Sequence, residues 1–72
     1  MEFKDILKEL RIEKDLKQRD LAEKINVTQA VISFLETGAR EPTVQMLKNI
    51  AKYFNVSIDY LVGLEDEYGN KI

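Results

Sequence analysis

The chain has 72 residues, which suffice for one domain with a modest hydrophobic core. Its 33% charged and 44% hydrophobic residues are typical of a soluble globular protein and not of a disordered one. Cysteine and histidine are both absent, which excludes disulfide scaffolds, serine–histidine triads and most zinc sites. We therefore expect a binding module and not an enzyme, without a metal site or a cofactor.

Apolar runs are short, and none approaches the roughly 18 residues needed to cross a bilayer. The N-terminal residues also lack the apolar core of a signal peptide, so we expect a cytoplasmic protein without a membrane partner. The net charge is −2, but residues 1–64 contain 10 basic and 10 acidic side chains, and the excess lies in residues 65–72. The neutral body predicts weak nonspecific attraction to a polyanion.

Hydrophobic spacing is helical nearly throughout, and no segment alternates with the period of two that marks a strand. The first helix is expected over about residues 2–14 and the second over about 18–25, with a bend at Leu16 between them. Asn26 tolerates a left-handed conformation and is expected to stop the second helix. The apolar stripes of these two helices are Phe3, Ile6, Leu7 and Leu10, and Leu21, Ala22 and Ile25.

Three further helices are each bounded by a polar N-cap and by a residue that suits a helix end. We expect the third over about residues 29–37, the fourth after the loop 39–42, and a short fifth before residue 64. The N-caps are Thr28, Thr43 and Ser57, and the stop residues are Gly38, Asn55 and Gly63. The sequence thus predicts an all-α, compact five-helix domain over residues 1–64, followed by an acidic flexible tail or linker stub over residues 65–72.

The second and third helices are separated by only about three residues, and this arrangement is the most informative in the chain. Ala22 is small where two crossing helices must approach closely, and Asn26 permits the tight turn between them. Such a pair leaves its second helix standing out from the surface. A helix exposed in this way can enter a DNA major groove, which is about 12 Å wide.

These segments resemble the Cro/repressor-type, or Xre, family of helix-turn-helix DNA-binding proteins over about residues 3–64. The matching pieces are Leu7–Arg11, Gln18–Ile25, Val27–Gln29, Ile32–Ser33, Leu35–Glu36, Gly38, Arg40–Pro42 and Leu47–Leu61. Each piece is short, but their joint order and spacing are specific. The resemblance implies a sequence-specific transcriptional regulator, more often a repressor, whose third helix reads double-stranded operator DNA.

Individual roles follow from the same resemblance. It makes Gln18 a contact at the start of the second helix and Thr28 a phosphate contact at the start of the third. Base-edge roles fall to Gln29, Ala30, Ser33 and Phe34. These assignments are chemically reasonable, because a glutamine amide can pair with adenine and an apolar side chain can touch a thymine methyl. Arg40 is expected on a backbone phosphate, and Lys17 and Arg19 add to the same basic edge.

Two further expectations concern scaffold and assembly. Arg11 and Glu36 match a salt-bridged pair of the family, which would tie the first helix to the end of the third. A homodimer is expected, at least on DNA, because one module of 8.4 kDa makes too few contacts for tight specific binding. The candidate dimer residues are Tyr60, Val62, Leu64 and Tyr68. Lys4, Lys8, Lys48 and Lys52 are expected on ordinary solvated helix faces.

The chain departs from the family pattern where Lys17 replaces a capping serine or threonine, which predicts fraying of the second helix. No Arg or Lys lies between Thr28 and Gly38, which disfavours guanine readout by the third helix. Phe34 is open to three interpretations: packing under the first helix, contact with thymine methyls, or contact with a protein. The last defines an alternative function, in which Val31 and Phe34 make the chain an adaptor or antirepressor-like module.

Overall fold

Five helices make up the regular structure in the computed structural model, which describes residues 1–72. The helices are α1 (Phe3–Glu13), α2 (Gln18–Lys24), α3 (Gln29–Thr37), α4 (Val44–Phe54) and α5 (Ile58–Leu61). The predicted all-α architecture is confirmed, and the expected helix ends lie within about one residue of the observed ones where a range was given. None of the five has the length and apolar character that crossing a membrane would need.

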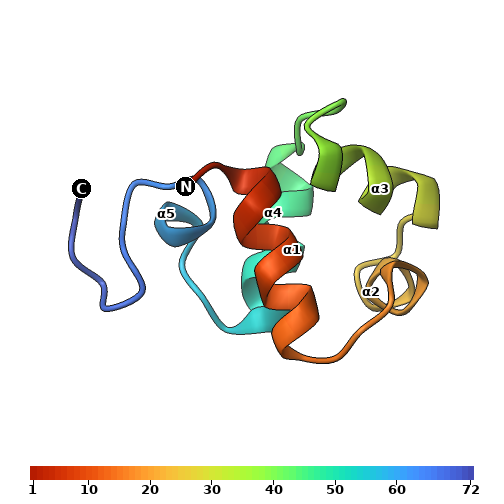
Figure 1. The fold of residues 1–72 in the computed structure, drawn as a ribbon, viewed down its shortest axis with the longest axis horizontal. Coiled ribbons are helices and arrows are strands. Elements are labelled where there is room, and N and C mark those ends of the chain that lie inside the picture. The colour runs from red at the N-terminus through yellow and green to blue at the C-terminus, as the bar shows by residue number, and fades with distance from the viewer.

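The hydrophobic core joins all five helices. Helix α1 contacts both α3 and α5, α2 contacts α3, and α4 contacts α5. Figure 1 shows the result: α2 and α3 lie at one end of the long axis, and the segment after α5 lies at the other. The buried side chains are Ile6, Leu7, Leu10, Leu21, Ala22, Ile25, Ile32, Leu35, Ile50, Phe54 and Leu61. Because α1 contributes to both halves of this core, it fixes the α2–α3 pair relative to the rest of the molecule.

Helix boundaries follow the predicted caps. The hydroxyl oxygens of the three predicted N-caps accept hydrogen bonds from the backbone N–H three residues later, at 2.9–3.3 Å. Asn26, Gly38 and Asn55 all have left-handed backbone, with φ of 60°, 81° and 56°. The bend after α1 also depends on a left-handed residue, Asp15, with φ of 57°, one residue before the predicted bend at Leu16.

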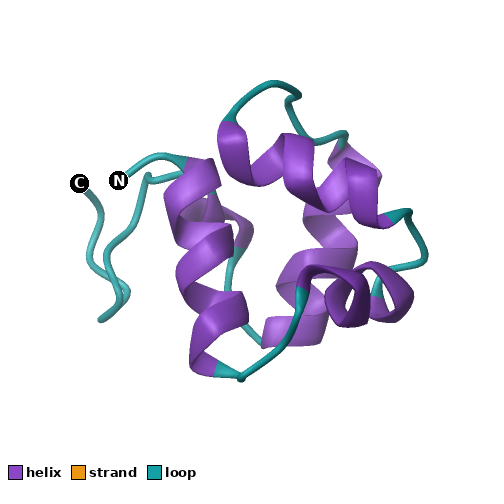
Figure 2. Ribbon diagram, turned by 45° about the vertical axis from the view of Figure 1, so that its right-hand side comes forward, coloured by secondary structure: helices purple, strands orange, loops and turns teal.

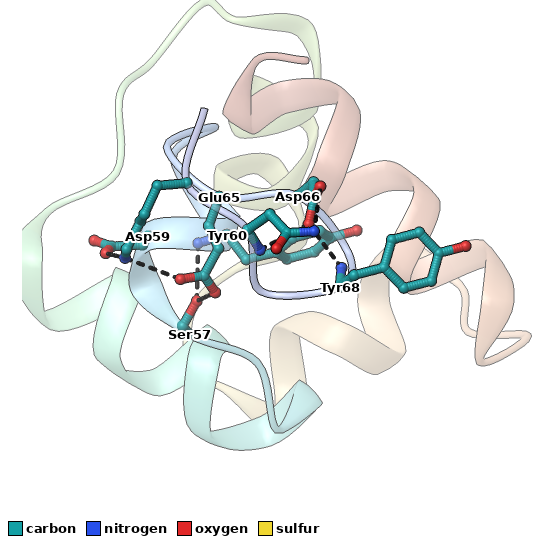
Figure 3. A network of polar contacts seen from close by, with 8 residues as sticks. Ser57, Asp59, Tyr60, Glu65, Asp66 and Tyr68 are labelled. Carbon is teal, nitrogen blue, oxygen red and sulfur yellow. Dashed lines mark hydrogen bonds and ion pairs between the residues drawn. The ribbon is translucent and has the colours of Figure 1, made fainter.

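Residues 65–72, predicted as an acidic flexible tail or linker stub, fold back against α5 in the structure (Figure 3). Glu65 and Lys71 form an antiparallel bridge, and the Lys71 ammonium pairs with the carboxylates of Asp59 and Glu65. The Ser57 hydroxyl donates to Glu65 Oε1 at 2.7 Å, and Asp66 Oδ1 accepts from two backbone N–H groups of the turn. The acidic side chains therefore organise this segment locally, which the charge pattern alone did not predict.

Candidate nucleic-acid interface

Helix α3 has one buried face and one open face. Ile32 and Leu35 are fully buried, whereas Gln29, Ala30 and Phe34 are exposed. Residues four apart share a helix face, so Ala30 and Phe34 form an apolar stripe on the open side. In Figures 1 and 2, α3 lies at the edge of the molecule with α2 beside it, and no other segment crosses its outer side. The residues predicted to meet base edges thus lie on a surface that a ligand can reach.

The turn between α2 and α3 holds this arrangement. Ala22 is only 3% exposed, and its carbonyl oxygen accepts from the Val27 N–H at 2.9 Å across the turn. Asn26 has the left-handed backbone that reverses the chain direction there. A larger side chain at position 22 would push the crossing helices apart, which supports the predicted reason for an alanine at this point.

Among the predicted base-edge residues, Ser33 is half-buried and Phe34 is 50% exposed. Phe34 does not belong to the core cluster or to the side chains packed against it, so packing under the first helix is excluded. The Thr28 hydroxyl accepts the cap hydrogen bond from Val31 N at 3.3 Å. A hydroxyl also has a proton to donate, so this cap leaves Thr28 able to donate to a phosphate oxygen.

The start of α2 lacks a side-chain N-cap, as the sequence predicted. The Lys17 side chain offers no acceptor, but the Lys17 backbone N–H donates to Asp20 Oδ2 at 2.9 Å. The Asp20 carboxylate satisfies the Lys17 N–H but does not replace the missing hydroxyl acceptor, so fraying of the second helix stays a prediction. Lys17 and Arg19 are both exposed at this end of α2, which leaves their cationic groups accessible.

A buried ionic network connects α1, α2 and α3. Arg11 Nε donates to Glu36 Oε2 at 2.6 Å, and Arg11 Nη2 donates to Glu36 Oε1 at 3.0 Å. The predicted pair is confirmed, and Glu36 raises the pKa of Arg11 above its usual value, mainly through this hydrogen bonding. Arg11 Nη1 also donates to the Leu16 carbonyl at 2.7 Å, which secures the loop before α2. Glu36 accepts a third hydrogen bond from Gln18, whose Nε2 donates to Glu36 Oε1 at 3.2 Å.

A hollow at the C-terminal end of α3 is lined by two cations, Lys4 and Arg40, and by two carboxylates, Glu2 and Glu41, and the sequence predicted only Arg40 as a contact. Arg40 is exposed, and its backbone N–H donates to the Phe34 carbonyl at 3.3 Å. Lys4 from α1 lines the same hollow as Arg40, and a Cβ at Gly38 would lie 3.2 Å from Lys4 Cδ. Lys4 is thus half-buried at this edge and not on an ordinary solvated face. No sequence pattern identified it, because only the crossing of α1 with α3 places it there.

The family described as helix-turn-helix matches residues 7–61, which is most of the chain. The chain belongs to this family, of the Xre type. The resemblance stated from the sequence is therefore confirmed. The relatives found are named as transcriptional regulators, and none of those named here is an enzyme.

A similar sequence is the HTH-type transcriptional activator BcrR of Enterococcus faecalis. It is 42% identical over 66 residues, which are 92% of this chain and 32% of that protein. The chain spans between 32% and 59% of the length of the first curated relatives that it matches. In these three relatives the similarity covers one region of a longer protein.

Two solved structures share the fold. The P22 c2 repressor protein, crystallised with a synthetic operator, has a TM-score of 0.82 and 24% identity over 86% of this chain and 94% of that chain. The N-terminal DNA-binding domain of SinR from Bacillus subtilis has a TM-score of 0.78 and 27% identity, covering 92% and 94%. The five-helix arrangement is thus shared with these proteins across nearly the whole chain.

Proposed function

We propose that residues 1–64 bind double-stranded DNA in a sequence-specific manner, with α3 in the major groove, and that the chain represses transcription. The open face of α3 carries this proposal. It presents Gln29, Ala30 and Phe34 to solvent on a helix whose opposite face is fully buried. The likeness to the DNA-binding domain of SinR, which has nearly the same extent, supports the same function.

The proposed contacts divide into those that fix register and those that read sequence. Thr28 and Arg40, with Lys17 and Arg19, meet backbone phosphates, and Gln18 makes a DNA contact at the start of α2. Gln29 reads an adenine edge through its amide, whereas Ala30, Ser33 and Phe34 line the groove. The apolar stripe favours thymine methyl groups, and the absence of Arg and Lys from α3 disfavours guanine.

Binding sites selected from random DNA by the purified chain would supply the preferred sequence. On that site, Gln29→Ala is expected to cost about 1–3 kcal/mol and to relax preference at one base position. Arg40→Ala is expected to weaken all sites similarly and to flatten the salt dependence by about one unit. Affinities for single-base variants of the site, measured at several salt concentrations, distinguish the two results. Equal weakening on every DNA by Gln29→Ala would mean that α3 does not read bases through this residue.

The proposal includes a homodimer that forms on DNA. Val62, Leu64 and Tyr68 are exposed, and Tyr60 is half-buried. These apolar side chains are few, so association in free solution is expected to be weak and strengthened by a palindromic site. Sedimentation with and without such DNA tests this, and a strict monomer under both conditions would contradict it. A promoter reporter separates repression from activation, the activity for which BcrR is named.

A second candidate function rests on one observation, the 50% exposure of Phe34 beside the half-buried Val31. An exposed aromatic side chain is typical of protein interfaces. In that case the same face would bind a protein, and the chain would be an adaptor or antirepressor-like module. Salt-dependent binding to the selected DNA favours the first function, and its absence favours the second.

A further inference from the structure

The buried carboxylate of Glu36 lies between the scaffold and a proposed DNA contact. Its side chain is 3% exposed, and it accepts two hydrogen bonds from Arg11 and one from Gln18. Arg11 secures α1, whereas Gln18 is the first residue of α2. One buried group therefore connects the scaffold to a side chain at the edge of the proposed interface.

The chemistry of Glu36 fixes the orientation of the Gln18 amide. An ionised carboxylate only accepts hydrogen bonds, so the oxygen of the Gln18 amide cannot face it and the nitrogen must. The remaining N–H and the carbonyl oxygen of Gln18 are then held in one arrangement. An exposed glutamine without such a partner, such as Gln29, has no comparable restraint within the chain.

We propose that Glu36 is a positioning residue for Gln18, holding its amide in the orientation that contacts DNA. This inference rests on the proposed function. Glu36 itself contributes no DNA contact, because it is buried at the junction of α1, α2 and α3. A preorganised donor loses less side-chain entropy on binding than a free one, which is the physical benefit of this arrangement.

The first test is an NMR measurement on the free protein. We expect the side-chain NH₂ of Gln18 to exchange more slowly with solvent than that of Gln29, which serves as the matched glutamine. Glu36→Gln should remove this difference, because a neutral amide at position 36 offers both a donor and an acceptor and no longer imposes one orientation. Equal exchange of Gln18 and Gln29 in the wild-type protein would overturn the inference.

The second test is a double-mutant cycle on DNA affinity. Gln18→Met removes the amide at similar length, and in the wild-type background it is expected to weaken binding about 3- to 10-fold. In the Glu36→Gln background the same change is expected to cost less than about 2-fold. Thermal melts establish a temperature at which all four proteins are folded. If the Glu36→Gln variant does not fold, the inference is tested by the exchange of the Gln18 and Gln29 side-chain NH₂ groups in the wild-type protein.

The outcomes separate this inference from the proposed function. Gln29→Ala serves as the control, because Gln29 has no bond to Glu36 and its effect on affinity should be the same in both backgrounds. DNA binding with an equal effect of Gln18→Met in both backgrounds would overturn the positioning role alone. If the wild-type chain bound no DNA, the proposed function and this inference would both be wrong.

Discussion

Two ionic networks lie in different parts of the molecule and differ mainly in the exposure of their cations to water. At the junction of α1, α2 and α3, the side chains of Arg11 and Glu36 are 13% and 3% exposed. Beside α5, the Lys71 side chain is 66% exposed, and its partners Asp59 and Glu65 are 46% and 16% exposed. Both networks use one cation with several acceptors, so the number of hydrogen bonds alone does not distinguish them.

Solvent decides how much each network stabilises the fold. Water and salt screen the Lys71 pairs, and ordering these exposed side chains costs entropy, so their net contribution is small. The charges of Arg11 and Glu36 are mostly removed from water, and losing either partner would leave the other buried without its counter-charge. Substitution of Arg11 or Glu36 is therefore expected to lower the free energy of unfolding strongly, and substitution of Lys71 only weakly.

The largest effect is expected for Arg11→Ala. It leaves the Glu36 carboxylate buried without its main donor, and it frees the Leu16 carbonyl, so it should lower the free energy of unfolding by about 3 kcal/mol. Lys8→Ala, on the exposed side of the same helix, is the matched control and should change stability little. Equal shifts in melting temperature for the two variants would contradict the structural importance of the buried pair.

A smaller effect is expected when both buried partners are made apolar together. The double variant Arg11→Met, Glu36→Leu removes both charges, so neither remains unpaired. It should therefore be more stable than Arg11→Ala, by about 1 kcal/mol or more, in urea unfolding. The double variant should at the same time lose the slow exchange of the Gln18 amide. A stability no better than that of Arg11→Ala would show that packing, and not the stranded charge, dominates at this site.

A still smaller effect is expected for Lys71→Ala at the exposed network. The melting temperature should remain close to that of the wild-type protein, because the Lys71 side chain that forms both pairs is 66% exposed. The change should be local, appearing as faster amide exchange of residues 64–72. High salt should produce the same local loosening in the wild-type chain while leaving Arg11 and Glu36 unaffected. A drop in melting temperature as large as that of Arg11→Ala would remove the distinction between the two networks.

The smallest effect is expected at acid pH and is confined to residues 64–72. Hydrogen bonds from Lys71 and then Ser57 lower the pKa of Glu65, and the backbone N–H of Asn70 lowers the pKa of Asp66. A lowered pKa in the folded state stabilises the turn above the ordinary carboxylate pKa of about 4, and this stabilisation is lost as the pH falls through the lowered value. Backbone NMR shifts of residues 64–72 should therefore change below about pH 4. Unchanged shifts throughout that range would contradict these contacts.

Much of the fold was predictable because its signals are local. The N-caps Thr28, Thr43 and Ser57 and the left-handed residues Asn26 and Asn55 act within a few residues, so the sequence around each one determines its helix end. The open face of α3 was predictable for a similar reason: helical periodicity separates Ile32 and Leu35 from Gln29 and Phe34. The pair of Arg11 and Glu36 followed only from the family resemblance.

Only the tertiary structure determined which side chains from distant segments meet. Glu36 accepts from Gln18 because α2 and α3 cross beside α1, and Lys4 reaches the end of α3 because α1 passes Gly38. No local sequence signal encodes the contact between Gln18 and Glu36 or the approach of Lys4 to the end of α3. The turn of residues 64–72 also depends on a partner outside it, since Lys71 pairs with Asp59 of α5. The sequence by itself determined the helices and the exposed face of α3, because these depend on neighbours in the chain. The shared buried carboxylate and the docked tail depend on contacts that exist only after the helices have packed.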